Sequence, residues 1–296
     1  MPKRAMEGYS DVRGTYMDER TSKTAVITGA ASGLGRAMSL AWASRGWKIG
    51  VADVDGEAAA ETVQMVKRAG GDGEVFLCNV RNLSEVQAMA DHFFSSWGTV
   101  GLLVNNAGVA DAGRVGEVLI ESWERIIETS LWGVIYGCHA FIPRMQGQRS
   151  GHILNIGSAA GFSSFPEMGS YNLVKAAVIS LSETLRVELA PHGIGVTVAC
   201  PTFFTSGLGR TLTYTDETLK QLTDALFSKA KLTADEVAGH IVQAVSKNKL
   251  YAIPGVDTKA FWFAKRLAPS LYAGKLAKAY AQEGSMIGVL KRLDRK

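Results

Sequence analysis

Seven short apolar runs alternate along the chain with longer stretches in which apolar residues recur at the helical period. The runs occupy residues 24–29, 47–53, 74–80, 101–108, 151–157, 195–200 and 250–255. Short runs that are apolar throughout are typical of buried parallel strands. The main helical stretches are 34–46, 56–70, 84–98, 122–146 and 171–191, and a capping box at Thr233–Glu236 opens another that continues to Val245.

Strands that alternate with helices predict a parallel sheet covered on both faces. Because the crossovers between parallel strands are right-handed, such a sheet winds in both directions from its centre. We therefore predict an α/β fold with one Rossmann-type, doubly wound parallel sheet of about seven strands and helices on both faces. Residues 23–255 are expected to form this domain, residues 1–22 a flexible leader, and residues 256–296 a basic amphipathic extension.

The composition is that of an ordinary globular protein, with 47% hydrophobic and 20% charged residues among 296. The net charge of +4 comes from the C-terminal end, where nine basic residues after residue 258 are opposed by Glu283 and Asp294. The body of the chain is slightly acidic, which argues against a nucleic-acid partner. No apolar run is long enough to span a membrane. Because residues 1–22 lack an apolar core and carry acidic residues, we expect them to be neither a secretory signal nor a transit peptide.

The three cysteines, Cys78, Cys138 and Cys200, lie far apart, each within an apolar run and without metal-ligand spacing. We expect them to be buried and reduced, which is typical of a cytoplasmic protein, and we expect no metal site.

A glycine-rich turn, TGAASGLG at residues 28–35, follows the first apolar run. Glycines allow a sharp turn and a close approach of the backbone to a ligand, and the helix that follows directs its first N–H groups at a phosphate. Asp53 ends the second run, where a carboxylate can bind an adenosine ribose and repel a ribose phosphate. A tight loop and an exposed aspartate would explain each feature separately, but together they favour a dinucleotide, NAD rather than NADP.

Tyr171 and Lys175 stand four residues apart at the start of a helical stretch. Such positions share one face of a helix, so an ammonium group can lie beside a phenol. The spacing alone fits both a proton-transfer pair and two ordinary residues of an amphipathic helix.

Several motifs together resemble the short-chain dehydrogenase/reductase family over roughly residues 22–255. The glycine turn resembles the family's cofactor turn, and Asn105–Gly108 resembles its N-N-A-G segment. Ser158 matches the family's catalytic serine, and Tyr171 with Lys175 matches its Y-x-x-x-K. Pro201 matches a P-G-x-x-x-T stretch near the nicotinamide. The order and the spacing of the motifs make the resemblance specific.

The resemblance implies an enzyme, an alcohol dehydrogenase or ketone reductase that uses a nicotinamide cofactor. Ser158 would hold the substrate oxygen, and Tyr171 would act as general acid and base. Lys175 would lower the pKa of Tyr171, ordinarily near 10, and hold the nicotinamide ribose. The residues implied in cofactor binding are Thr28, Gly29, Ser32, Gly33, Leu34, Gly35, Asp53, Val54, Asn79, Val80, Asn106, Ala107, Gly108, Tyr171, Lys175, Pro201 and Thr205.

Two positions depart from the family pattern. Thr202 stands where the family has glycine after the proline. Ser130 stands where the family has an asparagine that supports the lysine through a proton relay. Because a hydroxyl can both donate and accept, we expect a water-mediated link from Ser130 to Lys175 and count Ser130 among the catalytic residues.

The loops at residues 160–170 and 202–217, after the fifth and sixth strands, are expected to wall the substrate site. They are rich in apolar and aromatic side chains, which suits a hydrophobic secondary alcohol or ketone better than a sugar. Together with Ser158 and Tyr171, the expected substrate contacts are Phe162, Phe203 and Phe204. Residues 215–230 have helical character and are a candidate lid.

Two other functions stay open at this stage. A sugar epimerase or dehydratase of the extended family shares the Y-x-x-x-K motif, but it usually has a G-x-x-G-x-x-G turn and a longer substrate domain. A regulator could bind the nicotinamide cofactor without turning over a substrate.

The resemblance also implies a homodimer or homotetramer formed through residues 122–146 and 171–191. In the extension, Tyr272, Leu276 and Tyr280 share one helical face among lysines, and Pro269 interrupts or starts a helix. Packing of this face on the body or on a partner subunit is the simpler expectation. Peripheral contact with an anionic membrane is the alternative.

Overall fold

The apolar runs form one seven-stranded parallel sheet in the order β3-β2-β1-β4-β6-β7-β9. The computed structural model describes residues 21–204, 213–215, 220, 230, 232–286 and 288–289. The strands are β1 (Thr24–Thr28), β2 (Lys48–Asp53), β3 (Asp72–Leu77), β4 (Leu102–Asn105), β6 (Gly151–Ile156), β7 (Ile194–Ala199) and β9 (Tyr251–Ala252). The order reverses between β1 and β4, and a doubly wound sheet binds its ligand at that reversal. The predicted fold class is confirmed.

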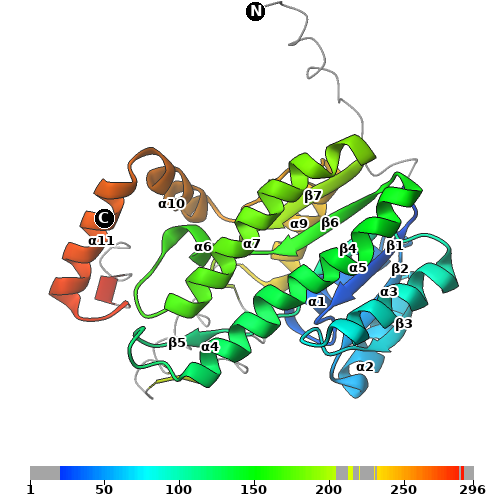
Figure 1. The fold of residues 1–296 in the computed structure, drawn as a ribbon, viewed down its shortest axis with the longest axis horizontal. Coiled ribbons are helices and arrows are strands. Elements are labelled where there is room, and N and C mark those ends of the chain that lie inside the picture. Colours follow the sequence, from blue (N-terminus) through cyan, green and yellow to red (C-terminus); the bar gives the residue numbers. More distant parts are fainter. Residues whose placement is uncertain are drawn as a thin grey trace, which may run out of the picture.

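Helices cover both faces of the sheet (Figure 1). The helices on one face are α1 (Gly33–Ala43), α2 (Gly56–Arg68) and α9 (Ala234–Ser246). Those on the other face are α3 (Leu83–Trp97), α5 (Gly133–Gln148) and α7 (Gly169–Glu188), and a short 3-10 turn at Ala190–His192 follows α7. The predicted capping box at the start of α9 is present, because the Thr233 side chain accepts from the Glu236 N–H and the Glu236 carboxylate accepts from the Thr233 N–H.

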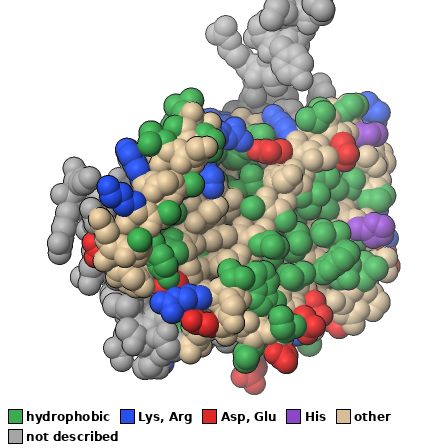
Figure 2. All heavy atoms as spheres, turned by 60° about the vertical axis from the view of Figure 1, so that its left-hand side comes forward, with side chains coloured by type: hydrophobic (Ala, Val, Ile, Leu, Met, Phe, Trp, Pro, Cys, Tyr) green, Lys and Arg blue, Asp and Glu red, His purple; other side chains and the backbone are tan. Residues whose placement is uncertain are grey.

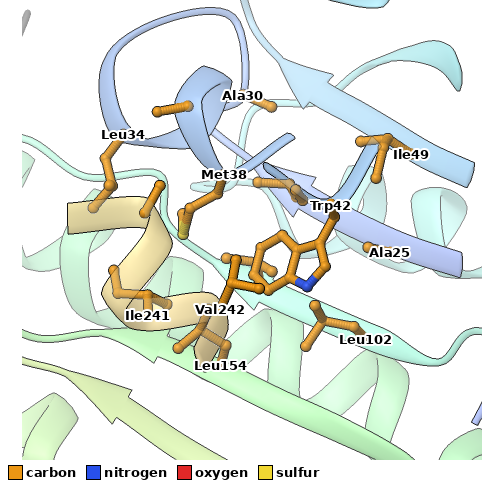
Figure 3. Close-up of a cluster of buried hydrophobic side chains, with 14 of the residues drawn as sticks. Ala25, Ala30, Leu34, Met38, Trp42, Ile49, Leu102, Leu154, Ile241 and Val242 are labelled. Atoms are coloured by element: carbon orange, nitrogen blue, oxygen red, sulfur yellow. The ribbon is translucent and has the colours of Figure 1, made fainter. Parts of the chain in front are cut away.

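The core on the first face lies between α1, α9 and the sheet (Figure 3). Trp42 and Met38 of α1 point toward Ile241 and Val242 of α9, above Leu154 of the sheet. All five are at most 5% exposed, and burial of one such side chain contributes about 1.5–3 kcal/mol relative to an exposed one. The glycine turn at the start of α1 is therefore carried by a rigid element.

Two of the predicted strands are shorter at their carboxyl ends than expected. β3 ends at Leu77 and β4 at Asn105, earlier than the apolar runs suggested. The remaining residues of each run, 78–80 and 106–108, form loops beyond the carboxyl ends of the strands. A short pairing of β5 (Asp111–Ala112) with β8 (Thr213–Tyr214) was not predicted.

The single helix expected at residues 122–146 is divided into three parts. These are α4 (Ile120–Ile127), a π-helical turn (Glu128–Trp132) and α5. A π turn inserts an extra residue into a helix and is frequent at functional sites. Here it contains Ser130, which is fully buried.

The C-terminal extension forms α10 (Val256–Leu267) and α11 (Pro269–Glu283), and Pro269 begins the second helix. Helix α10 lies beside α6 (Ala160–Ser163), and α11 packs on α10 farther out, at the end of the molecule where the strands terminate (Figure 1). Leu276 packs against the cluster of Phe165, Met168 and Met286, so this apolar face is used within the chain. No described helix is both long and apolar enough to cross a membrane.

Candidate active site

A cavity of about 510 Å³ opens at the reversal of strand order, between the ends of β1 and β4. Such a volume suits a small-molecule or cofactor site. The predicted cofactor residues that line it are Gly29, Ser32, Gly33, Leu34, Asp53, Val54, Asn79, Val80, Asn106, Ala107, Gly108, Tyr171, Lys175 and Pro201. Predicted Thr205 lies outside the described residues.

Two predicted residues support the glycine turn instead of lining the cavity. The Thr28 hydroxyl accepts the N–H groups of Asn106 and Ala107, each at 3.1 Å. Gly35 packs so closely that a Cβ there would lie 2.1 Å from the carbonyl oxygen of Gly29. These contacts hold the turn against the loop that follows β4.

Gly29 has a φ of +64°, and a Cβ on it would lie 2.8 Å from Cα of Ala107. Only glycine combines this backbone with this approach. At the other end of the turn, the Ser32 side chain does not cap α1. Ser32, Gly33 and Leu34 line the cavity, so the first N–H groups of α1 are open to an anion. The turn therefore fits the pyrophosphate of a dinucleotide.

Asp53 is held rigidly at the edge of this cavity. One carboxylate oxygen accepts the Ala31 N–H at 2.9 Å, and the other accepts the N–H groups of Val54 at 2.8 Å and Asp55 at 3.2 Å. The guanidinium of the nearby Arg36 is already engaged, because it donates to the Ala31 carbonyl at 2.6 Å and to the Glu61 carboxylate at 2.7 Å. The geometry presents a fixed negative charge beside the glycine turn.

A second, apolar pocket adjoins the first. It is lined by Ala110, Ala112, Ser158, Ala159, Ala160, Phe165, Met168, Tyr171, Pro201, Thr202, Phe203, Phe204 and Met286. Of the predicted substrate residues, Phe203 and Phe204 line it, whereas Phe162 is not part of its lining. Tyr171, Pro201 and Phe204 line both cavities. The phenol therefore stands where the two cavities meet.

Helix α7 brings the tyrosine and the lysine together. Lys175 Nζ lies 5.6 Å from the centroid of the Tyr171 ring and donates to the Ile156 carbonyl at 2.8 Å. The Ser158 hydroxyl, which follows β6, accepts the Ala160 N–H at 3.2 Å. Lys175 and Ser158 are only 5% and 9% exposed, so both polar groups work in an environment with little water.

The prediction that Lys175 lowers the pKa of Tyr171 is wrong, because in the protein by itself this pKa is raised. Burial raises the pKa of Tyr171 to about 12, although the Ser158 hydroxyl opposes the shift. Burial also lowers the pKa of Lys175 to about 8. Desolvation favours the neutral form of both groups, so at neutral pH the phenol holds its proton and the lysine is mostly charged.

Sequence reasoning missed several lining residues. Those of the first cavity are Cys78, Arg81, Val109, Arg125, Thr129, Ile156 and Gly157. Cys78, Val109 and Gly157 follow the carboxyl ends of strands, which is a signal that could have identified them. Met286 comes from the extension, and nothing in the local sequence marks it. All three cysteines are free and buried, as predicted.

The comparisons with known proteins agree with this architecture. The model of the short chain dehydrogenase family matches residues 23–217. A Mycobacterium tuberculosis protein named as an oxidoreductase, SadH, is 33% identical over 270 residues, which are 90% of this chain and 98% of SadH. The chain belongs to the short-chain dehydrogenase/reductase family and is an oxidoreductase of that family.

Two solved structures show which cofactors relatives bind. A short-chain dehydrogenase/reductase from Burkholderia phymatum in complex with NAD has a TM-score of 0.80 at 33% identity, over 86% of this chain and 96% of that one. A short-chain dehydrogenase from Sphingobium yanoikuyae in complex with NADPH has a TM-score of 0.71 at 26% identity, over 85% and 95%. Relatives thus bind either nicotinamide dinucleotide.

Proposed function

We propose that this chain is an NAD-dependent dehydrogenase/reductase that interconverts an apolar secondary alcohol and its ketone, with Tyr171 as the general acid and base. One observation carries the proposal: the Tyr171 phenol lies at the junction of the dinucleotide cleft and the apolar pocket. A carbinol held there would place its oxygen beside a proton-transfer group and its carbon toward the cleft.

The residues of the first cavity would hold the cofactor. The N-terminus of α1 would bind the pyrophosphate, Asp53 the adenosine ribose, and Lys175 the nicotinamide ribose. When bound, the nicotinamide supplies or accepts the hydride, and in its oxidised form it adds a positive charge to the site. Asp53 supports NAD over NADP because a phosphate on the ribose would meet its carboxylate while Arg36 is engaged with Glu61.

Side chains of the second pocket would transfer the proton to or from the substrate oxygen. With its pKa raised to about 12, the Tyr171 phenol holds its proton at neutral pH and can donate it to the more basic alkoxide that develops in the direction of ketone reduction. The Ser158 hydroxyl would hold the same oxygen. In the direction of alcohol oxidation the phenolate must form, so additional positive charge near Tyr171 is required, and the Lys175 ammonium contributes part of it.

Apolar lining supports a hydrophobic substrate. Apart from Ser158, Tyr171 and Thr202, the side chains around the pocket are alanine, phenylalanine, methionine and proline. A sugar would leave its hydroxyl groups without partners on these walls, which costs free energy. The proposal therefore specifies a lipophilic aliphatic or aryl carbinol.

We also propose a homo-oligomer that forms through α5 and α7. Trp132, Leu173 and Val187, on or next to these helices, are 44%, 49% and 75% exposed. Figure 2 shows apolar side chains gathered over a broad part of the face it presents. Large exposed apolar patches are typical of protein interfaces.

The test is a screen of lipophilic secondary alcohols with NAD, in which NADH formation is followed by its absorbance. We expect turnover of a carbinol with an apolar substituent and little turnover of polyols. A protein that binds NADH but oxidises no alcohol, and reduces none of the corresponding ketones, would instead be the nicotinamide-binding regulator considered above.

A further inference from the structure

The C-terminal extension is hydrogen-bonded to the segment that joins Ser158 to Tyr171. Lys265 Nζ of α10 donates to the Ser164 hydroxyl at 2.9 Å. The Tyr272 hydroxyl of α11 donates to the Ser163 carbonyl at 3.0 Å. Both helices therefore contact the same short stretch, which lies between two residues of the candidate active site.

Glu167 accepts hydrogen bonds from the end of the extension. The Tyr280 hydroxyl donates to one carboxylate oxygen at 3.0 Å, and the Met286 N–H donates to the other at 3.1 Å. Arg114 donates to the Tyr280 hydroxyl at 3.2 Å, so this cluster also reaches the loop after β5. Both oxygens of one carboxylate thus bind residues of the extension.

The segment at residues 163–167, which these hydrogen bonds hold, has an unusual backbone. Ser164 and Glu167 have φ values of 52° and 61°, a region that residues with a side chain rarely adopt. Such conformations persist where surrounding contacts determine them. Both residues receive their side-chain hydrogen bonds from the extension.

Met286 is the residue that these contacts place in the pocket. It is 1% exposed and forms a cluster with Phe165 and Met168, and Tyr171 packs against this cluster. It lines the same pocket as Ser158 and Tyr171. Met286 is therefore a wall of the pocket, although it lies beyond α11 and far along the chain from Tyr171.

We propose that the C-terminal extension is a substrate-specificity element, in which Glu167 clasps the extension and Met286 sets how large an apolar carbinol the pocket accepts. This inference rests on the proposed function, since it concerns the substrate of the same site. A methionine suits such a wall, because its unbranched thioether adapts to irregular apolar surfaces. The extension then serves the active site of its own chain.

The first test varies the size of residue 286. Met286→Ala enlarges the pocket, Met286→Trp reduces it, and Met286→Leu keeps its volume as the control. Across secondary alcohols of increasing chain length, we expect Met286→Ala to raise the kcat/KM ratio of long to short substrates about tenfold, and Met286→Trp to lower it. The KM for NAD should stay constant. The same preference in all three variants, each with wild-type NADH binding, would overturn the proposal.

The second test breaks the hydrogen bonds between Glu167 and the extension, which we call the clasp, and its measurement does not require enzyme turnover. Glu167→Ala removes both acceptors, so we expect faster amide hydrogen exchange at residues 163–168 and 286, with NADH affinity unchanged. Glu117→Ala is the matched control, because Glu117 also pairs with Arg114, at 3.2 Å, but its side chain is 52% exposed. Unchanged exchange in Glu167→Ala would reject the clasp. If the wild-type protein turns over no alcohol but Glu167→Ala shows this faster exchange, the proposed function is rejected while the clasp is supported.

Discussion

The Ser130 hydroxyl and the backbone of Val109 exchange two hydrogen bonds. Ser130 Oγ donates to the Val109 carbonyl and accepts the Val109 N–H, each at 3.0 Å. Val109 lines the first cavity, and a Cβ added to the neighbouring Gly108 would lie 3.2 Å from Ser130 Oγ and 3.7 Å from Lys175 Nζ. The π turn thus brings a buried hydroxyl to the loop that borders the lysine. Because its single proton is donated to Val109, Ser130 is a positioning residue, and a water-mediated link to Lys175 would use its remaining lone pair.

Ser130→Ala should lower kcat/KM about tenfold, or about 1.4 kcal/mol of activation free energy. The loss of both bonds frees Val109, so NADH affinity should fall as well. Ser130→Asn should retain most of the activity, since an amide can also donate and accept. Steady-state kinetics and NADH titration measure both effects, with the exposed Ser95→Ala as control. A wild-type pH–rate profile for Ser130→Ala would remove Ser130 from the functional residues.

Tyr171→Phe should lower kcat about 10²–10⁴-fold, the usual contribution of general acid–base catalysis. The ring still packs between the two cavities, so NADH binding should persist. Tyr136→Phe is a suitable control, because Tyr136 stacks on Trp132, away from the pocket lining. Near-normal turnover in Tyr171→Phe would refute the proposed role of the phenol.

Asp53→Asn should narrow the preference for NAD over NADP, because it removes the negative charge that would repel a ribose phosphate. The amide oxygen of asparagine can keep the N–H groups of Val54 and Asp55, but its NH2 group cannot accept the Ala31 N–H, so the affinity for both cofactors should also fall. The ratio of kcat/KM for the two cofactors is the measurement. A wild-type enzyme that prefers NADP would show that the assignment of Asp53 is wrong.

NADH affinity should fall as the pH rises above about 8. Burial lowers the pKa of Lys175 to about 8, so its ammonium is present below that pH and lost above it. If the ammonium binds the nicotinamide ribose, affinity should drop by up to about tenfold per pH unit on the alkaline side. Lys175→Met should bind weakly at pH 7 and show no such decline. Constant wild-type affinity between pH 7 and 9 would exclude this role.

His152 should make the fold less stable in acid. It is fully buried in β6, and burial lowers its pKa to about 3, with the charge of Arg186 acting in the same direction. Since the unfolded histidine has a pKa near 6.5, the unfolded state binds the extra proton, and stability is lost as the pH falls from about 6.5 toward 3. At pH 5 the loss should be about 2 kcal/mol. Urea titrations at several pH values test this.

His152→Gln should remove most of that pH dependence. His240→Gln, which changes an exposed histidine of α9, should keep it. An unaltered acid profile in His152→Gln would mean that other groups control acid unfolding.

Local patterns allowed the fold to be predicted because each element carries its own signal. The alternation of apolar runs with helical periods specified the strands, and the capping box marked the start of α9. The helix at 122–146 was the main departure. Its periodicity continues through the π turn. The extra residue of that turn is stabilised by the bonds of Ser130 to Val109, which lies 21 residues earlier and outside the helix.

The sequence by itself determined the glycine turn, the acid after β2 and the tyrosine–lysine spacing, since each is a short-range pattern that folds in the same way wherever it stands. Tertiary structure alone decided that Tyr171 borders both cavities, that burial raises its pKa, and that Met286 lines the second pocket. These properties depend on desolvation and on contacts between distant segments. Neither desolvation nor such contacts can be predicted from neighbouring residues in the sequence, because both arise only when the chain folds and distant segments come together.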